Sequence, residues 1–329
     1  MNKSVVKIFT EGGFDIGLGH ITRCCSLHDE ITSRGYDVTF YINGEISKIK
    51  QLENYKVVNA DWLKKEYLES QISDEDYCII DSYLADKSLY DSIANRAKKV
   101  LYIDDMNRIV YPKGIIVNPS LSTETIHYLN QNDNELLLGS DYIILRKPFQ
   151  RIQKKNIHEV PSRVLIIMGG TDMRNIAPQI INATSNRKSE LKIDVVVGIT
   201  SRNMEQFEAT KDENIKFYRD IEAKELRDIM MNADFAITAS GQTIYELLAV
   251  KTPFIPIKIA ENQSNNLNGL KKYYPDLHYI DIDKVDWMYS LIKEFYRMMR
   301  YEYRLTFNAY YHKLVDGMGA RRIVDRFLG

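Results

Sequence analysis

The chain has 329 residues, which at about 150 residues per domain corresponds to two domains. Its 44 lysines and arginines against 45 aspartates and glutamates leave a formal charge of −1. This balance argues against nucleic acid, an anionic membrane or a polyanion as the main partner. Hydrophobic residues at 44% and charged residues at 27% are typical of a globular chain and exclude wholesale disorder.

The cysteines and the apolar runs of the sequence indicate in which cellular compartment the protein is expected. The three cysteines include no C-x-x-C pair, which argues against a disulfide framework or a structural zinc site and fits a reducing cytosol. The N-terminus lacks the apolar core of a signal peptide, and no apolar run approaches the ~20 residues of a membrane-spanning helix. We therefore expect a cytoplasmic protein that does not insert into membranes.

Short apolar runs alternate with helix-forming stretches in the first half of the chain. The run at 5–10 predicts a buried strand, which a glycine-bearing loop at 12–19 connects to a helix at 21–32. Further strands are predicted at 37–42, 56–58, 77–80, 99–103 and 114–117. Strands separated by helices pair in parallel through crossover connections, so this half predicts a doubly wound α/β domain.

The same pattern restarts after residue 160. Strands are predicted at 163–168, 192–197, 215–218, 235–238 and 253–257, and helices at about 287–328. The aromatic and basic run EFYRMMRYEYRLTF in these helices could be an RNA or membrane patch, but a helix with Tyr and Phe toward a core and Arg outward explains it more simply. The polar and basic segment 150–163 has the composition of a linker. We expect domains at 1–150 and 163–290, followed by terminal helices at 291–329. Ligands of doubly wound domains bind at the carboxyl ends of strands, so the two domains are expected to face a cleft.

The first motif is the glycine loop that ends at His20. Its glycines allow a tight turn and close approach of a ligand, but Thr22 stands where the last glycine of G-x-G-x-x-G would be. A dinucleotide site is therefore not indicated. His20 can accept a proton from water or a hydroxyl, or alternatively cap the helix by bonding to backbone. His28, two turns later, fits a structural role.

Acids and a phenol directly follow two other strands of the first half. Asp81 and Tyr83 come after one strand, and Asp104 and Asp105 after the next. These side chains can bind a substrate or orient His20, whereas the alternative for each aspartate is a helix cap. Adjacent residues of a strand point to opposite faces, which argues against a shared metal ion for the last two.

The second half offers two anion-binding turns and one polar cluster. The cluster is ENQSNN at 261–266, which opens another helix and whose amides can bond sugar hydroxyls. The turn at Gly169, Gly170 and Thr171 can present N–H groups to phosphate but lacks the lysine and spacing of a Walker A loop. The turn at 240–243 opens a helix without bulky side chains, and Glu246 lies one turn in, within reach of ribose hydroxyls. A capped glycine turn and a capped helix with a first-turn glutamate are the structural alternatives.

With these residues in place, the chain resembles the UDP-sugar hydrolases of pseudaminic acid biosynthesis. These enzymes have the glycosyltransferase-B (GT-B) fold, with two Rossmann-like domains, and are related to the UDP-N-acetylglucosamine transferase of peptidoglycan assembly. The chain also resembles spore-coat polysaccharide proteins described as predicted glycosyltransferases. The resemblance runs to about Lys272, and its marks are GLGHITRC, IIDSY, YIDD, VNPS, GSDYIILRKPF, MGGTD, SGQTIYE and ENQSNN. In the wider fold group, terminal helices cross back onto the first domain, so the resemblance implies that the helices at 291–329 pack back across the domain junction.

The resemblance implies hydrolysis of UDP-2,4-diacetamido-2,4,6-trideoxy-β-L-altropyranose to UDP and the free sugar. Water attacks the anomeric carbon with inversion, without a cofactor or a bound metal. His20 and Tyr83 would then be catalytic. Substrate would contact Asp15, Gly17, Gly19, Arg23, Asp81, Asp105, Asn262 and Gln263. UDP would contact Gly169, Gly170, Thr171, Ser240, Gly241, Gln242, Thr243 and Glu246.

Several alternatives share these motifs. An inverting GT-B glycosyltransferase of surface polysaccharide or flagellin glycan synthesis would use an acceptor hydroxyl in place of water. A UDP-sugar 2-epimerase and a nucleotide-sugar-binding regulator without turnover are further possibilities. Ser82 stands where members of the hydrolase family often have histidine, so the activity or the substrate can differ here. The sequence does not indicate the oligomeric state.

Overall fold

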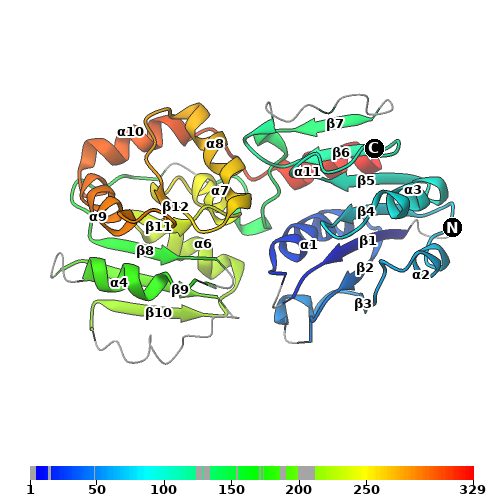
Figure 1. Cartoon of the computed structure of the whole chain (residues 1–329), viewed down its shortest axis with the longest axis horizontal. Helices are drawn as coiled ribbons and strands as arrows, with labels where there is room; N and C mark the ends of the chain where they lie inside the picture. Colours follow the sequence, from blue (N-terminus) through cyan, green and yellow to red (C-terminus); the bar gives the residue numbers. More distant parts are fainter. Residues whose placement is uncertain are drawn as a thin grey trace. The chain divides into compact units, whose positions relative to one another are not determined.

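The computed structural model describes residues 5–13, 16–47, 49–123, 128, 134–152, 155–169, 172, 174–185, 190–198 and 212–329. The chain divides into two compact units, the first made of Met1–Lys147 with Met318–Gly329 and the second of Pro148–Gly317. Each unit is a parallel β-sheet with helices on it (Figure 1), which confirms the predicted α/β fold class. In the described part of the chain, no helix is long and apolar enough to span a membrane.

The sheet of the first unit has the strand order β3-β2-β1-β4-β5-β6-β7, and every pairing is parallel. The winding direction therefore reverses between β1 and β4, which lie side by side. All the strands predicted for this half are present, and β7 is an additional edge strand. Their bounds are β1 Val5–Glu11, β2 Asp37–Asn43, β3 Val57–Asn59, β4 Tyr77–Asp81, β5 Lys99–Ile103, β6 Ile115–Asn118 and β7 Glu135–Leu138.

Apolar side chains cover both faces of this sheet. Val6 and Ile8 of β1 belong to one buried cluster with residues of α1 and α11, whereas Phe9 belongs to a second cluster with residues of α2 and α3. This alternation follows from the two-residue period of a strand. The helices are α1 Gly19–Thr32, α2 Lys65–Ser70, α3 Lys87–Arg96 and α11 Gly319–Leu328, with 3-10 turns at Lys50–Leu52, Ser140–Tyr142 and Lys147–Phe149.

The helix α11, drawn in red in Figure 1, completes the first unit from the far end of the sequence. Its residues Ile323 and Phe327 are fully buried in the same cluster as Ile21 and Leu27 of α1. The glycine that begins α11 is sterically required, because a Cβ atom at Gly319 would lie 2.2 Å from the carbonyl oxygen of Ile143. The first unit therefore takes part of its core from the last residues of the chain.

The sheet of the second unit has the strand order β10-β9-β8-β11-β12-β13, again with parallel pairings. Its winding reverses between β8 and β11. The two-residue strand β13 adds an edge that the apolar pattern does not predict. The strands are β8 Arg163–Ile167, β9 Lys192–Val197, β10 Ile215–Arg219, β11 Phe235–Ala239, β12 Phe254–Lys258 and β13 Ile280–Asp281.

The helices of the second unit include the predicted aromatic and basic stretch. Helix α9 contacts α4 and the strands β12 and β13, and α10 follows it directly. The helices are α4 Ala177–Ser185, α6 Ala223–Asn232, α7 Thr243–Ala249, α8 Ser264–Tyr273, α9 Trp287–Met298 and α10 Tyr301–Tyr311, with a 3-10 turn at Glu261–Gln263.

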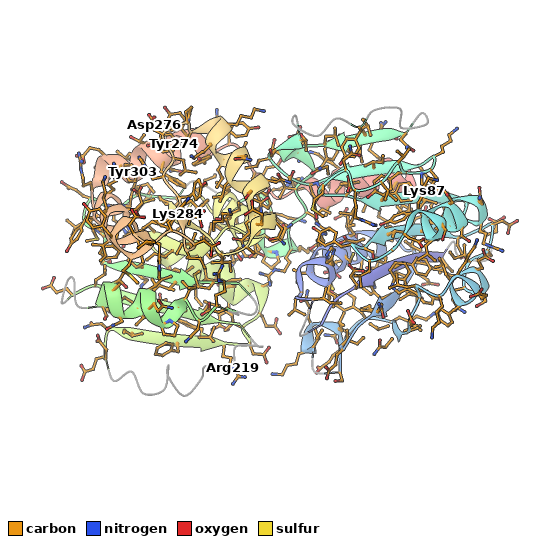
Figure 2. The ribbon with its side chains drawn as sticks, viewed as in Figure 1. Lys87, Arg219, Tyr274, Asp276, Lys284 and Tyr303 are labelled. Atoms are coloured by element: carbon orange, nitrogen blue, oxygen red, sulfur yellow. The ribbon has the colours of Figure 1, made fainter. Side chains whose placement is uncertain are left out.

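The C-terminal aromatic stretch packs largely as predicted. Phe295 and Phe307 are buried, and the buried ring of Tyr274, which is labelled in Figure 2, stacks on the ring of Tyr310. The expectation that its arginines point outward is wrong for Arg304, which is fully buried. Its guanidinium donates to the carbonyl oxygens of His158 and Glu159 at 2.5 and 3.1 Å, because those carbonyls lack partners in a helix or sheet.

The segment 150–163, which the sequence predicts as a linker, lies within the second unit. The buried carboxylate of Asp234 accepts hydrogen bonds from the backbone N–H groups of Ser162 and Arg163 at 2.8 and 2.9 Å. It also contacts the Nδ1 atom of His158 at 2.7 Å. Lys155 donates to the hydroxyl oxygen of Thr252 at 2.7 Å. These bonds attach the segment to the body of the unit.

Candidate functional site

The carboxyl ends of β1, β4 and β5 bring polar side chains together in the first unit. In the sheet register, Thr10 of β1 pairs with Asp81 of β4, and Asp81 pairs with Ile103 of β5. Residues that directly follow these positions therefore share one edge of the sheet. This edge includes the point at which the winding reverses, where doubly wound folds bind their ligands.

The loop between β1 and α1 sets the position of His20. Gly13 and Gly17 bond to each other through their backbones at 2.8 and 3.1 Å, and both have positive φ angles, of 148° and 92°. A Cβ atom at Gly13 would lie 2.8 Å from the carbonyl oxygen of Glu45, so a larger residue does not fit there. The loop leads directly into α1, and His20 lies in the first turn of that helix.

His20 forms a buried pair with Asp81. Its Nδ1 atom lies 2.7 Å from Oδ1 of Asp81, and only 7% of His20 is exposed. An ionised carboxylate only accepts hydrogen bonds, so in the neutral imidazole Nδ1 carries the hydrogen and Nε2 the lone pair. Nη2 of Arg23, which lies 3.2 Å from Nδ1, donates to Oδ1 of Asp81 at 2.5 Å. No described residue bonds to Nε2. The pair is thus arranged to accept a proton at Nε2, and neither His20 nor Asp81 serves as the predicted alternative helix cap.

Arg23 lies one turn after His20 and joins two carboxylates. Its Nε atom donates to Asp81 at 2.5 Å, and Nη1 donates to both oxygens of Asp105 at 2.9 and 2.8 Å. Burial alone would raise the pKa of Asp81, but Arg23 and His20 outweigh burial and hold that pKa well below its usual range. Burial lowers the pKa of Arg23, and Asp105 and Asp81 more than compensate. Both groups are therefore charged at neutral pH.

Tyr83 completes this network on its outer side. Its hydroxyl donates to Oδ2 of Asp105 at 2.5 Å, and its ring meets the His20 ring edge-on with centroids 4.4 Å apart. Burial and the neighbouring Asp105 raise the pKa of Tyr83, so the phenol keeps its proton at neutral pH. Tyr83 can therefore orient a ligand or the His20 ring, but it does not supply a base.

The structure thus brings together five predicted residues, which are His20, Arg23, Asp81, Tyr83 and Asp105. Beside them, the backbone at Gly17 and Gly19 is open, since no atom lies within 4 Å of a Cβ atom placed there. Asp15, predicted to contact substrate, lies outside the described residues.

Asp104 and Asp105 point to different partners, as their adjacent positions predict. Asp104 is buried and accepts from the backbone N–H of Asn107 at 2.7 Å and from the hydroxyl of Tyr128 at 2.7 Å. It therefore shapes the loop after β5, while Asp105 faces Arg23. In the described part of the chain, no group of three histidine, cysteine or acidic side chains is arranged to hold a metal ion.

The structure adds one residue that the motif analysis did not assign. Glu11 ends β1 and is 1% exposed, and its carboxylate accepts hydrogen bonds from the Ser82 hydroxyl and the Tyr83 backbone N–H. An acidic residue at the end of an apolar strand, directly before a glycine pair, was the signal available in the sequence.

In the second unit, the turn after β11 is tightly held. The Ser240 hydroxyl donates to the carbonyl oxygen of Ile257 at 3.0 Å, and Asn266 donates to the carbonyl oxygen of Ser240 at 2.8 Å. Tyr245 in turn donates to Asn266 at 2.6 Å. A Cβ atom at Gly241 would meet nothing within 4 Å, which leaves this backbone open to a ligand.

The remaining predicted residues of the second unit occupy the same edge of its sheet. Thr243 begins α7, with Gln242 just before it, and Glu246 is buried in the first turn of that helix. After β12, Asn262 is exposed, and the side-chain oxygen of Gln263 accepts from the backbone N–H of Ile259 at 2.9 Å. One part of the Gln263 amide is thus committed to its own loop.

The turn after β8 is described only in part. Gly169 has a φ angle of 84° and open space at its Cβ position, so its backbone is accessible. Gly170 and Thr171 lie outside the described residues. Asp172 accepts from the backbone N–H groups of Ile176 and Ala177 at 2.9 and 3.0 Å and so stabilises the start of α4.

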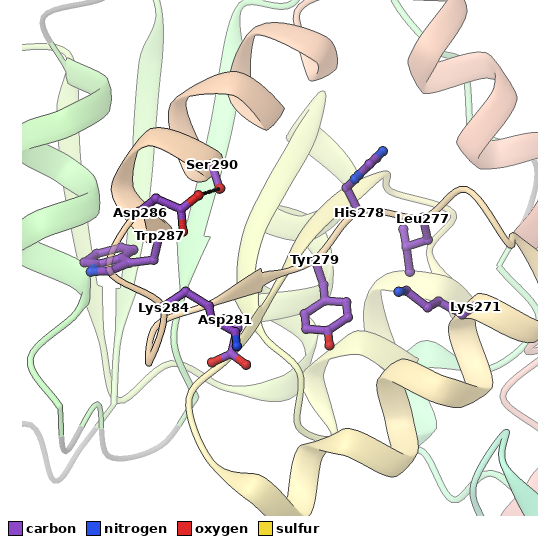
Figure 3. Close-up of a pocket in the computed structure, with 9 residues that line it drawn as sticks. All are labelled: Lys271, Leu277, His278, Tyr279, Asp281, Lys284, Asp286, Trp287 and Ser290. Atoms are coloured by element: carbon purple, nitrogen blue, oxygen red, sulfur yellow. Dashed lines mark hydrogen bonds between the residues drawn. The ribbon is translucent and has the colours of Figure 1, made fainter.

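A separate pocket of about 290 Å³ lies beside β13 in the second unit (Figure 3). Lys271 lies over the Tyr279 ring, with its Nζ atom 4.9 Å from the ring centroid, and Asp281 lies near Lys284. None of the residues predicted to contact sugar or UDP lines this pocket.

Known proteins similar to this chain were found by sequence. The chain is 24% identical over 310 residues to an uncharacterised protein of Methanocaldococcus jannaschii, covering 84% of this chain and 63% of that protein. It is 23% identical to the spore coat polysaccharide biosynthesis protein SpsG of Bacillus subtilis, covering 97% of this chain and 96% of that protein. No family model matches the chain.

A third relative is a protein of Helicobacter pylori described as pseudaminic acid cytidylyltransferase and UDP-2,4-diacetamido-2,4,6-trideoxy-β-L-altropyranose hydrolase. It is 25% identical over 261 residues, covering 78% of this chain and 45% of that protein. The chain thus spans less than two thirds of the M. jannaschii and H. pylori relatives. These similarities confirm the resemblance stated from the motifs.

Solved structures decide the fold. MurG of Acinetobacter baumannii matches with a TM-score of 0.65 at 11% identity, covering 99% of both chains. The calicheamicin glycosyltransferase CalG4 matches with a TM-score of 0.65 at 10% identity, covering 100% of this chain and 99% of that chain. The chain has the GT-B fold. The two sheets of the GT-B fold are the doubly wound sheets described above, and at these identities the likeness concerns the fold alone.

Proposed function

We propose that this GT-B protein is an enzyme that hydrolyses a UDP-sugar, UDP-2,4-diacetamido-2,4,6-trideoxy-β-L-altropyranose, to UDP and the free sugar. The observation that carries the proposal is the buried His20–Asp81 pair, whose Nδ1 to Oδ1 distance is 2.7 Å. The H. pylori relative is described as a hydrolase of this UDP-sugar, which supports the choice of substrate. The more general proposal, that the protein is an enzyme acting on nucleotide sugars, is also supported by the fold that it shares with MurG and CalG4.

In the proposed reaction, His20 acts as the general base. A water oxygen attacks the anomeric carbon, one water proton passes to Nε2 of His20, and the bond between that carbon and the phosphate oxygen breaks with inversion. Asp81 stabilises the imidazolium that forms, because its charge lies against Nδ1. Arg23 holds Asp81 in place and keeps it ionised.

The leaving group is UDP, which departs with its negative charge. The backbone N–H of Ser240 donates to the carbonyl oxygen of Ile257 at 2.9 Å. We propose that the N–H groups at Gly241, Gln242 and Thr243 and the N-terminus of the helix they open hold the diphosphate. Glu246 would accept bonds from the ribose hydroxyls, and the accessible turn at Gly169 would add N–H groups. The charge on UDP is met by these donors, so the proposal includes no resident metal or cofactor.

A glycosyltransferase that uses the same donor is supported equally well. SpsG of B. subtilis, which covers the chain almost completely, is described as a polysaccharide biosynthesis protein, and CalG4 is a glycosyltransferase. In that case His20 would take the proton of an acceptor hydroxyl, and the rest of the chemistry would be the same. An acceptor therefore distinguishes the two functions.

The test measures UDP release from the altrose derivative in water enriched in oxygen-18, with and without sugar or peptide acceptors. Hydrolysis by the proposed route places the label in the free sugar. Label in UDP instead would contradict attack at the anomeric carbon. Turnover that begins only when an acceptor is added would favour the transferase, and a UDP-sugar inverted at C2 would reveal an epimerase. UDP binding without any turnover would identify a regulator.

A further inference from the structure

Ser82 stands at the point where this chain departs from the family it resembles, and its hydroxyl has no capacity left for chemistry. The residue is 3% exposed. Its oxygen accepts hydrogen bonds from the backbone N–H groups of Leu84 and Ala85 at 3.0 and 2.9 Å. Its single proton is donated to Oε2 of Glu11 at 2.5 Å. One donor and two acceptors exhaust a hydroxyl group, so Ser82 is a structural part of the loop.

Glu11 is the other half of this arrangement. Its second oxygen, Oε1, accepts from the backbone N–H of Tyr83 at 2.6 Å. Among the described residues, no lysine, arginine or histidine forms an ion pair with Glu11, although its carboxylate is almost fully buried. Burying a carboxylate without a cation is costly, and these two hydrogen bonds are its compensation. Both of them hold the loop that carries Tyr83.

The same loop is held from its opposite side. Arg108 donates to the carbonyl oxygen of Ala85 at 2.5 Å, and the Tyr90 hydroxyl donates to that of Ser82 at 3.2 Å. These contacts fix the carbonyl side of the loop. Glu11 alone among the described side chains bonds the N–H of Tyr83, the residue whose ring meets His20 and whose hydroxyl meets Asp105.

We propose that Glu11 is a positioning residue which, together with Ser82, fixes the backbone of Tyr83 and thereby sets the Tyr83 side chain against His20. The inference rests on the proposed function, in which His20 is the general base, and on the Tyr83 ring that meets the His20 ring and can orient it. The proposal also gives a role to the serine at position 82, where members of the family often have histidine. Ser82 supports Tyr83 and transfers no proton.

The experiment compares Glu11→Gln with the wild type in the UDP-release assay. Ser82 and Tyr83 donate to different oxygens of Glu11, and glutamine replaces one of these oxygens with an NH2 group, which cannot accept. In the wild-type arrangement, the substituted side chain therefore satisfies either Ser82 or Tyr83 but not both. We expect the turnover number to fall by about 10- to 100-fold, as for a misplaced group next to the reaction, with KM and UDP affinity nearly unchanged. An unchanged turnover number would overturn the proposal.

A double-mutant cycle separates positioning from a general loss of stability. If Glu11 acts through Tyr83, adding Glu11→Gln to Tyr83→Ala lowers turnover little further. Equal fold-losses in the two backgrounds would overturn the proposal. Asp76→Asn is the matched control, because Asp76 is also a buried carboxylate of this unit but lies before β4, where it accepts from Lys7 at 2.7 Å. It should lower the melting temperature and leave turnover unchanged.

A crystal structure of the Glu11→Gln variant tests the inference without relying on activity. We expect the Tyr83 hydroxyl to leave Asp105, and an unmoved Tyr83 would contradict the proposal even if the wild type cleaves no UDP-sugar. Absence of wild-type turnover with every acceptor would instead contradict the proposed function alone. Should Glu11→Gln fail to fold, Glu11→Asp keeps the charge, shortens its reach by one methylene and is judged by the same two measurements.

Discussion

His20 and Asp81 acquire their joint role only through the fold, because 61 residues separate them along the chain. The pair directs the single imidazole hydrogen toward the carboxylate and leaves the other nitrogen as a base. Arg23 adds a positive charge that balances the buried acids around it. At the scale of residues, the site is therefore a chain of charged hydrogen bonds with one acceptor left open among its described neighbours.

Replacing His20 by alanine tests that open acceptor. We expect turnover to fall by about 10²–10⁴-fold, the usual contribution of a general base, while UDP affinity measured by calorimetry stays the same. His28→Ala is the control, since His28 lies in the same helix and stacks on Phe40 with centroids 5.4 Å apart. That variant should lose stability but keep its turnover number, and equal losses in both variants would remove His20 from the mechanism.

Glu246 offers a test of the proposed UDP contact. We expect Glu246→Ala to weaken UDP binding by about tenfold, the effect of losing roughly one charge-assisted hydrogen bond, with a smaller effect on chemistry at saturating substrate. The matched control is Glu261→Ala, an exposed glutamate after the next strand that pairs with Lys258. Unaltered UDP affinity in Glu246→Ala would argue against the ribose role.

At the scale of elements, the sequence predicts the central strands of both sheets and misses two edge strands, β7 and β13. The central strands have continuous apolar runs, so their positions were predicted to within about a residue. Length does not explain the missed β7, because the equally short β6, with four residues, is predicted. β13 has two residues, too few for a period to be recognised. Glu11 was missed for a related reason, because a single acid at the end of a strand gives no sign of the loop that will meet it.

The attachment of the 155–163 segment to Asp234 predicts a dependence of stability on pH. Burial alone would raise the pKa of Asp234, but the backbone N–H groups of Ser162 and Arg163 and the side chain of His158 hold it below the ordinary value. A carboxylate with a lowered pKa stabilises the fold above its unfolded pKa of about 4, and this contribution is lost as the pH falls below that value.

Urea unfolding of the second unit between pH 6 and 3 measures this effect. We expect Asp234→Asn to be less stable at pH 6 and to lose less stability than the wild type on acidification. Burial lowers the pKa of the nearby Lys155 to about 7, which is above this range, so that lysine is protonated throughout and does not contribute to the difference. If the unfolding free energies of wild type and variant fall by the same amount between pH 6 and 3, the role of Asp234 is contradicted.

At the scale of the whole molecule, the organisation into units is what the sequence shows least. The hydrophobic pattern predicts helices at the C-terminus, but nothing in that pattern says that α9 and α10 belong to one unit and α11 to the other. That assignment depends on which apolar surface each helix covers, and this surface exists only after both sheets have formed. The near-zero net charge likewise says little about a dianionic ligand when backbone N–H groups supply the positive potential.

Phe327→Ala tests the contribution of α11 to the first unit. Phe327 is fully buried, and truncating a buried phenylalanine costs about 3–5 kcal/mol. We expect the unfolding transition of the first unit to move to lower temperature in calorimetry while UDP still stabilises the second. Arg321→Ala, at an exposed position of the same helix, should stay within about 0.5 kcal/mol of the wild type. A Phe327→Ala protein as stable as the wild type would contradict this role.

The interrupted first unit also constrains the order of events on the ribosome. Residues 148–317, all of the second unit, are synthesised before the last twelve residues that complete the core of the first. The first 147 residues therefore cannot complete their core until residues 318–329 have been synthesised. Until then, the apolar surface that α11 will cover is exposed to solvent. Released chains that end at Gly317 should consequently hold a protease-resistant second unit and a protease-sensitive first one.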